Sequence, residues 1–429
     1  MKIIDIQALE VLDSRGNPTV LATLILDDGS IGSALVPSGA STGSYEAVEL
    51  RDGDLNRYGG LGVQTAIKNI LTIIKPALLG LEAQEQTKID QLMITLDGTK
   101  NKARLGANSI LAVSLALARA AAASLKLPLY AYLSRFNPDF KGRYLLPVPM
   151  FNILNGGRHA NWATDIQEYL ILPVGAHSIT EAVKMGTEIY QQLKKVLKDK
   201  KYNITVGDEG GFAPNVSSNE EAFILVKAAV YAAGYVLGRD IVFGIDAAAT
   251  EFFQDGFYHL HKEGKKMSGP ELTVFYKKLR SKYPIVSFED IFAEDDWASF
   301  QNFRAAYPEV QLVGDDLYVT NIERLARGIK EKTTNSILIK LNQIGTLSET
   351  IATILEARKH GLSSIVSHRS GETEDTFIAD LVVAMGTGQI KTGAPARSER
   401  TAKYNRLMII EAELAEQGEY ASFPFPFKS

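Results

Sequence analysis

The stretch SILIK, residues 336–340, ends an apolar run on a lysine, Lys340. Lysine is almost never fully buried without a partner, so its place in this run needs an explanation. Six other runs share the form, a short apolar strand candidate that reaches a charged or titratable residue: NITVGDE (203–209), IVFGID (241–246), PIVSFED (284–290), VQLVGDD (310–316), SSIVSH (363–368) and GQIK (388–391). The residues reached by the seven runs are Glu209, Asp246, Glu289, Asp315, Lys340, His368 and Lys391.

The spacing of these seven residues predicts a barrel. They follow one another at intervals of 23 to 43 residues, which is the length that a strand, a helix and two loops require. Helical periods over 179–200, 218–236, 270–282 and 347–360 alternate with short β-rich runs. Alternating strands and helices favour an α/β protein with parallel strands, and we expect a (β/α)8-type TIM barrel. All seven strand ends would then meet at one rim, where barrel enzymes carry their active sites.

The first part of the chain has a different pattern. Residues 1 to about 60 indicate short strands, with a hairpin turn at Asp27-Asp28-Gly29, and helical periods follow over 63–81, 86–95 and 105–125. Strands followed by a run of helices indicate an α+β domain. Because residues 135–149 are rich in Pro, Gly and charge, we place a boundary there. We therefore predict an N-terminal α+β domain over 1–135 and a barrel domain with the active site over 136–429.

Composition excludes several classes of site. The 429 residues carry a net charge of −4 and contain no cysteine, which excludes disulfides, thiolate metal sites and cysteine nucleophiles. A mildly acidic chain gives no electrostatic reason to expect nucleic acid or an anionic membrane as a partner. The apolar stretch 105–125 is interrupted by Arg119, so we expect a buried core helix there and no membrane span. The N-terminal residues show no secretory signal pattern, and we expect a cytoplasmic protein.

The residue types expected at the rim suggest metal-assisted chemistry. An acidic residue after a strand is often only a helix cap, but here complementary types recur at the same topological point. Asp246, Glu289 and Asp315 would converge as hard oxygen ligands, which select Mg²⁺ or a similar ion. Such a cation, together with burial, would lower the pKa of Lys340 and make it a usable general base. Lys391 and Arg369 would bind an anionic substrate.

Longer segments around these residues resemble a known family. The chain resembles enolase, of the enolase superfamily, over essentially its full length. The segments that carry the resemblance include VPSGASTGSYEAVELRDGD (36–54), ILNGGRHA (153–160), VGDEGGFAPN (206–215), SILIKLNQIGTLSET (336–350), SHRSGETEDTFIADL (367–381) and IKTGAPARSERTAKYN (390–405). The barrel would accordingly be the enolase variant of the TIM barrel.

The resemblance implies a reaction and a role for each site residue. The reaction is the reversible dehydration of 2-phospho-D-glycerate to phosphoenolpyruvate, in glycolysis and gluconeogenesis. By the resemblance, Lys340 is the base on C2 and Glu209 the acid on the C3 hydroxyl. The other implied catalytic residues are Glu168 as partner of Glu209, His159 in a loop that closes over the substrate, and His368 lining the site. The implied phosphate contacts are Arg369 and Ser370, and Lys391 is implied to contact the carboxylate. Gln167, Lys340 and Ser41 are further implied substrate contacts.

The resemblance also implies cofactors and assembly. Two Mg²⁺ ions are expected per site, a tight one on Asp246, Glu289 and Asp315, and a second that arrives with substrate and contacts Ser41. A homodimer is expected, possibly an octamer. The chain departs from the family pattern at Arg158, at Trp162 and at Ile291-Phe292-Ala293.

Two other functions remain open at this point. One is a different member of the superfamily, such as a racemase or a sugar-acid dehydratase, which would share the barrel and the metal carboxylates. The other is a surface-binding protein in a secondary cell-surface or secreted pool. The C-terminal sequence FPFPFKS, with Lys428 one residue before the end, gives that second alternative weak support.

Overall fold

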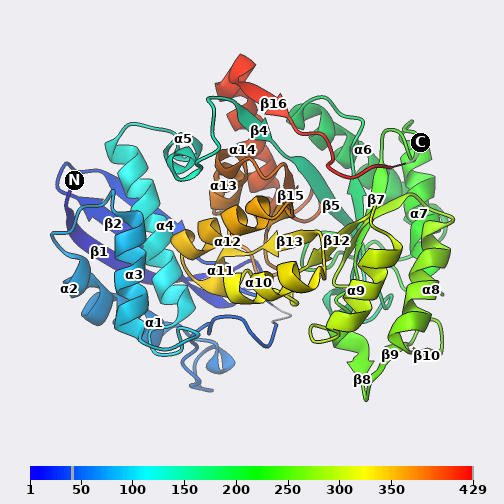
Figure 1. Cartoon of the computed structure of the whole chain (residues 1–429), viewed down its shortest axis with the longest axis horizontal. Helices are drawn as coiled ribbons and strands as arrows, with labels where there is room; N and C mark the ends of the chain where they lie inside the picture. The colour runs from blue at the N-terminus through cyan, green and yellow to red at the C-terminus, as the bar shows by residue number, and fades with distance from the viewer. Residues whose placement is uncertain (40–42, 428–429) are drawn as a thin grey trace.

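The structure is a computed structural model that describes residues 1–39 and 43–427, without the side chain of His159. Ser41, and the side chain of His159, therefore lie outside the described residues. Figure 1 shows two parts side by side: a sheet with helices in blue to cyan, and a barrel ringed by helices in green to red.

The N-terminal part is an antiparallel three-stranded sheet covered by helices, as the sequence predicts. Val20, Ala22, Leu24 and Leu26 alternate along β2 and are all buried, because successive side chains of a strand point to opposite faces. The predicted hairpin is confirmed, with Gly29 at φ +83° in its turn. The elements are β1 (Ile3–Leu12), β2 (Pro18–Leu26), β3 (Ile31–Leu35), α1 (Gln64–Asn69), a π-helical turn (Ile70–Ile74), α2 (Lys75–Leu78), α3 (Gln86–Asp97), α4 (Ala107–Ser124) and α5 (Leu129–Leu133).

Helix α4 is the core of this part. Among the helices in the described residues, it alone is long and apolar enough to cross a membrane, and 83% of it is buried inside the protein. Strand β3 approaches it closely, since a Cβ on Gly32 would lie 2.2 Å from the carbonyl oxygen of Ala116. The packing identifies α4 as the core helix that the sequence predicts.

The second part is a closed eight-stranded barrel, as predicted, but its strands are not all parallel. In barrel order the strands are β11 (Ile285–Glu289), β12 (Gln311–Gly314), β13 (Ser336–Ile339), β14 (Ser363–Ser367), β15 (Gln389–Lys391), β5 (Val148–Asn155), β6 (Glu168–Leu172) and β7 (Val242–Asp246). Strand β6 runs antiparallel to both of its neighbours. The prediction of a parallel barrel is therefore wrong at β6.

The predicted strand over 203–209 is also wrong. This segment is irregular, with one isolated bridge between Val206 and Phe212, and it lies between helix α6 (Ile179–Asp199) and helix α7 (Asn219–Ala232). The remaining strands complete small sheets outside the barrel: β4 (Tyr144–Leu146), β8 (Phe253–Gln254), β9 (Phe257–Leu260), β10 (Lys265–Met267) and β16 (Gly418–Tyr420). The helices of this part are α6 (Ile179–Asp199), α7 (Asn219–Ala232), α8 (Gly269–Arg280), α9 (Trp297–Ala306), α10 (Ile322–Glu331), α11 (Leu341–Ile344), α12 (Leu347–Lys359), α13 (Phe377–Met385) and α14 (Ser398–Leu414).

The base of the barrel is filled by apolar side chains. Leu338 belongs to this interior cluster, whereas Ile337 and Ile339 face the larger core outside the barrel. The other members are Met150, Leu170, Leu172, Val242, Val286, Val313 and Ile365, with Phe423 of the C-terminal tail covering them. The charged residues that line the cavity described below lie at the opposite end of the barrel strands. The division of the chain at 135/136 stays a prediction.

Candidate active site at the barrel rim

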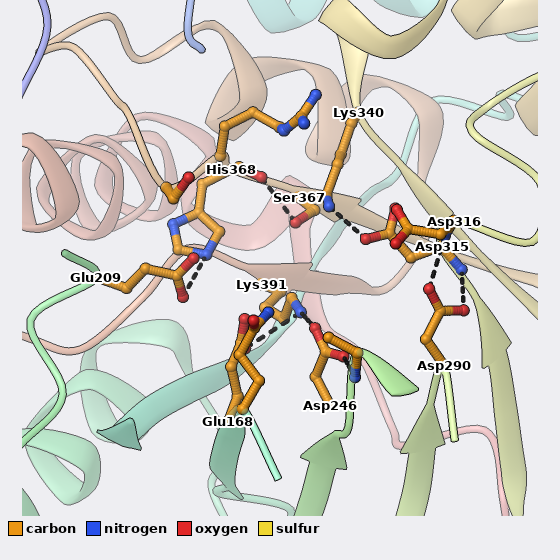
Figure 2. A pocket seen from close by; sticks show the side chains of 14 residues that line it. Glu168, Glu209, Asp246, Asp290, Asp315, Asp316, Lys340, Ser367, His368 and Lys391 are labelled. Atoms are coloured by element: carbon orange, nitrogen blue, oxygen red, sulfur yellow. Dashed lines mark hydrogen bonds and ion pairs between the residues drawn. The ribbon is translucent and has the colours of Figure 1, made fainter. Parts of the chain in front are cut away.

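The charged side chains converge at the carboxyl ends of the barrel strands (Figure 2). Asp246, Glu289 and Lys391 are the last residues of β7, β11 and β15, and Asp315, Lys340 and His368 directly follow β12, β13 and β14. Glu168 reaches the same rim because the reversed strand β6 begins there, where Glu168 pairs in register with Asp246. The residues that line this cavity are Gln167, Glu168, Glu209, Asp246, Ala248, Asp290, Asp315, Asp316, Lys340, Ser367, His368, Arg369, Ser370 and Lys391.

Lys391 holds three buried carboxylates together. Its Nζ lies 2.7 Å from Oε1 of Glu289, 3.0 Å from Oδ2 of Asp246 and 3.2 Å from Oε2 of Glu168. Burial alone would lower the pKa of Lys391, but the surrounding carboxylate charges raise it well above its usual value. The ammonium is therefore fully charged at neutral pH.

Burial and neighbouring carboxylates disfavour the charged forms of Glu289 and Glu168 at the rim. Burial, followed by the charge of Asp246, raises the pKa of Glu289 well above its usual value. The pKa of Glu168 rises well above its usual value because of burial and the neighbouring charge of Glu209. Oε2 of Glu289 is buried and has no hydrogen-bond partner among the described residues. Such a set of oxygen donors suits a hard divalent cation such as Mg²⁺.

A second acidic group lies beside Lys340. Carboxylate oxygens of Asp290, Asp315 and Asp316 lie within 4.8 Å of one another, a spacing at which they could hold a metal ion. This group shares only Asp315 with the ligand set expected from the sequence. Asp290 and Asp316 were missed, although both stand in quoted runs, as the second acids of SFED and VGDD. Burial raises the pKa of both well above the usual range.

Lys340 forms an ion pair with Oδ2 of Asp315, whose Oδ1 accepts from Nε2 of Gln343 at 2.9 Å. Burial acts to lower the pKa of Lys340, but the Asp315 charge outweighs it and the pKa is raised. The expectation of a lowered pKa does not hold among the protein's own groups. The sequence did not reveal that the nearest charge to Lys340 is a carboxylate.

His368 connects Glu209 to a buried arginine. Its Nε2 lies 3.3 Å from Oε2 of Glu209, and its Nδ1 lies 2.5 Å from Nη1 of Arg400. Burial, together with Arg400, lowers the pKa of His368 to about 4 even though Glu209 opposes the shift. His368 is therefore neutral at pH 7. Oε2 of Glu209 also accepts from Nδ2 of Asn152 at 2.8 Å.

Arg369 carries positive charge over the other side of the cavity. Its guanidinium donates to both carboxylate oxygens of Glu46, at 3.0 and 3.1 Å, and to Oδ1 of Asn342 at 2.8 Å. Ser370 and Gln167 also line the cavity. The sequence analysis did not identify four further residues of the rim, because only the tertiary structure brings them there. These residues are Glu46, Asn152, Asn342 and Arg400.

The departures from the family pattern lie around the site. Arg158 is exposed and lies 3.2 Å from Glu251. Ile291, Phe292 and Ala293 are buried, and Phe292 packs against the rings of Tyr258 and Phe300. The 291–293 segment is therefore part of the hydrophobic core and does not reach the cavity.

Two family models match the chain. Residues 3–133 match "Enolase, N-terminal domain" and residues 143–426 match "Enolase, C-terminal TIM barrel domain". Together they cover both parts of the fold and every described residue of the rim. The chain therefore belongs to the enolase family, the phosphopyruvate hydratases.

Proposed function

We propose that Lys340 removes the C2 proton of 2-phospho-D-glycerate and that Glu209 protonates the C3 hydroxyl as it leaves. The C2–H bond breaks first and its proton goes to Nζ of Lys340. The C3–O bond then breaks, the carbon–carbon double bond of phosphoenolpyruvate forms, and the proton from Glu209 departs in the water. The observation that carries this proposal is that the two groups reach one cavity from separate elements, on different sides of Lys391 (Figure 2). A base and an acid so separated can act on adjacent carbons.

The cations of the rim suit the two anionic groups of this substrate. Arg369 and Ser370 would contact the phosphate, since a guanidinium matches phosphate geometry. Lys391 would contact the carboxylate and Gln167 another polar group of the substrate. Glu168 would support Glu209, because the two charges already interact in the protein. The roles of His159 and Ser41 stay predictions from the sequence.

Enolases use Mg²⁺, and we propose two ions per active site. Asp246, Glu289 and Asp315 would hold the first, and Ser41 would contact the second when substrate binds. Bound Mg²⁺ supplies positive charge that lowers the pKa of Lys340 and stabilises the charge developing on the substrate carboxylate. The orphaned Oε2 of Glu289 supports this assignment.

The roles of Lys340 and Glu209 can be separated by isotope exchange. Lys340→Ala should lower kcat by about 10²- to 10⁴-fold, the usual contribution of a general base. It should also abolish exchange of the C2 proton with D₂O. Glu209→Gln should lower turnover while C2 exchange continues, because Lys340 remains. Lys330→Ala, on exposed α10, is the matched control and should behave as wild type. C2 exchange that survives in Lys340→Ala would overturn the assignment of the base.

The substrate itself is tested by a direct assay. The purified protein with Mg²⁺ and 2-phosphoglycerate should develop the ultraviolet absorbance of phosphoenolpyruvate. Turnover of a mandelate-like acid in its place would favour the racemase or sugar-acid dehydratase alternative.

We further propose a cytoplasmic homodimer, to be checked by light scattering and by cell fractionation. A secondary surface-binding role has no support in the described residues, and Lys428 lies outside them.

A further inference from the structure

Residues 43–46 follow the N-terminal sheet along the chain and are bound by two side chains of the barrel part, Glu294 and Arg324, which we call the barrel clamp. The hydroxyl of Ser44 donates to Oε1 of Glu294 at 2.5 Å, and the N–H of Ser44 donates to Oε2 at 3.1 Å. The guanidinium carbon of Arg324 lies 3.7 Å from the centre of the Tyr45 ring, which is a cation–π contact. The barrel clamp therefore holds two consecutive residues of the segment.

The barrel clamp is itself fixed by hydrogen bonds. The N–H of Glu294 donates to Oγ1 of Thr250 at 3.0 Å, and its carbonyl oxygen accepts from Nη2 of Arg324 at 3.1 Å. Nε of Arg324 donates to the carbonyl oxygen of Leu317 at 2.7 Å. Glu294 is 9% exposed, so its carboxylate binds the segment in a largely desolvated place. Residues 43–46 are thus bound to a part of the barrel whose own position is set.

Glu46, at the end of this segment, connects it to the cavity. Its Oε2 accepts from Nη1 of Arg369 at 3.0 Å, and its Oε1 accepts from Nη2 of Arg369 at 3.1 Å. Oε1 also accepts the N–H of Gly43 at 3.1 Å and Nε2 of Gln343 at 3.3 Å. The place of the Glu46 carboxylate therefore depends on the path of residues 43–46.

We propose that Glu294 and Arg324 are positioning residues for the substrate phosphate: they hold residues 43–46, and Glu46 of this segment orients the guanidinium of Arg369. The inference rests on the proposed contact of Arg369 with the phosphate. It adds two residues that do not line the cavity and gives them a role in the affinity for the substrate.

The pairing of Glu46 with Arg369 makes this transmission possible. A carboxylate that bonds both terminal nitrogens of a guanidinium fixes the plane of the guanidinium as well as its distance. Arg369 is buried, so the surrounding protein decides its orientation. A shift of Glu46 would therefore turn Arg369 away from the phosphate. The phosphate ester stays intact in the dehydration, so its contacts are alike in the ground and transition states and should affect KM and not kcat.

The first experiment measures KM and kcat for 2-phospho-D-glycerate with saturating Mg²⁺. Glu294→Ala removes both acceptors of Ser44, and we expect KM to rise about 3- to 30-fold, within the range of coupling between contacting side chains, and kcat to stay within about twofold. Glu294→Gln keeps one acceptor and should restore most of the affinity. Unchanged KM in a folded Glu294→Ala protein, or a lower kcat at unchanged KM, would overturn the proposal.

Two further variants make this result specific. Glu323→Ala is the matched control, because Glu323 on α10 also joins the barrel part to the N-terminal part, through exposed Lys100 at 3.3 Å, and it should behave as wild type. The double variant Ser44→Ala/Tyr45→Ala removes the side chains that the barrel clamp holds, and both residues are exposed. It should raise KM as Glu294→Ala does. If Glu294→Ala does not fold, unchanged KM in this double variant would overturn the proposal.

A double-mutant cycle shows whether the barrel clamp acts through Arg369. Arg369→Gln alone should raise KM, and adding Glu294→Ala should then change KM by less than about twofold, because the route is already broken. Two increases that multiply would indicate another route and overturn the proposal. If Arg369→Gln leaves KM unchanged, the phosphate contact of Arg369 is wrong and the inference falls with it. If Arg369→Gln raises KM and Glu294→Ala does not, the proposed function stands and only the role of the barrel clamp is refuted.

Discussion

The carboxylate of Asp290 accepts the backbone N–H of Asp315 through Oδ1 at 2.9 Å and that of Asp316 through Oδ2 at 2.7 Å. Both oxygens of this buried acid are thus used to shape the loop after β12. Asp290 itself stands directly after β11, at φ +41°. One carboxylate thereby sets the position of the next strand's acidic pair.

Removing one of these two acceptors should weaken metal binding. In Asp290→Asn only one oxygen remains, and the new amide N–H₂ would face a backbone N–H. Asp315 would then shift, and loss of a group that orients a ligand typically costs 10- to 100-fold in metal affinity. Titration calorimetry with Mg²⁺ measures this. Asp255→Asn, in an exposed turn, is the control, and equal affinities in the two variants would contradict the expectation.

Binding of Mg²⁺ should release protons. The pKa values of Glu168, Glu289, Asp290 and Asp316 are raised by burial and mutual charge, so these groups hold their protons to higher pH than free carboxyl groups do. Carboxylates must be ionised to bind a metal. We expect release of about one proton or more per site at pH 7. Calorimetry in buffers of different ionisation enthalpy counts it, and buffer-independent heats would contradict it.

The same shifts predict a pH-dependent stabilisation by Mg²⁺. A carboxyl group whose pKa is higher in the folded than in the unfolded state adds stability below its unfolded pKa of about 4. That stability is lost as the pH rises toward the folded pKa. In EDTA the four raised groups should therefore lower Tm progressively above about pH 4. The rise in Tm on adding Mg²⁺ should be larger at pH 8 than at pH 5, as thermal melts would show, and an equal rise would be inconsistent with this account.

Loss of the Lys391 ammonium should destabilise the protein strongly. Lys391→Met leaves Glu168, Asp246 and Glu289 buried without their shared counter-charge. Breaking a buried pair on one side costs about 3–5 kcal/mol. Urea denaturation in EDTA measures this, and the loss should be smaller at pH 5, where the acids can be protonated. A loss of unfolding free energy that is the same at both pH values would contradict this explanation and would indicate only a packing defect.

The tail at the barrel base should matter for stability and not for catalysis. Phe423 is 9% exposed and covers the interior cluster, while the charged rim lies at the opposite end. Phe423→Ala should cost about 3 kcal/mol in unfolding free energy, as for other buried phenylalanines, with KM unchanged. The half-exposed Phe257 provides the control, since Phe257→Ala should cost little. A changed KM in Phe423→Ala would show coupling through the barrel.

Much of the fold and of the rim could be predicted because strand ends follow a simple rule. The apolar runs that end at Asp246, Glu289, Lys340 and Lys391 can be recognised from the local sequence. Parallel strands of a barrel have their carboxyl ends at the same rim, independently of how the helices outside are arranged. The direction in which a strand runs relative to its neighbours is not encoded in its local sequence pattern. A short buried strand has the same apolar pattern in a parallel and in an antiparallel pairing, and the reversed direction of β6 was therefore not predicted.

Residues that reach the site only through the tertiary structure could not be predicted from the sequence. Arg400 stands on a helix, and nothing in SERTAKYN distinguishes a buried guanidinium from a surface one. The raised pKa of Lys340 depends on a contact with Asp315, 25 residues away. The effect of one charged side chain on the pKa of another depends on their distance in the folded protein.

The reversed direction of β6 has a consequence for how the site could be rebuilt. Because β6 ends at the base and β7 begins there, the chain between them goes up along α6 and returns along α7, and Glu209 lies in the turn at the top. Lys340, in contrast, directly continues a barrel strand. The segment that carries Glu209 is anchored to barrel strand β5 at Phe212, whose N–H donates to the carbonyl oxygen of Ile153 at 2.9 Å and whose carbonyl oxygen accepts from the N–H of Asn155 at 2.8 Å. The residues before Phe212 form no part of the strand pairing between β6 and β7. Under the proposed roles of Glu209 and Lys340, a different sequence before Phe212 would change the leaving-group half of the chemistry while the proton-abstracting half kept its frame.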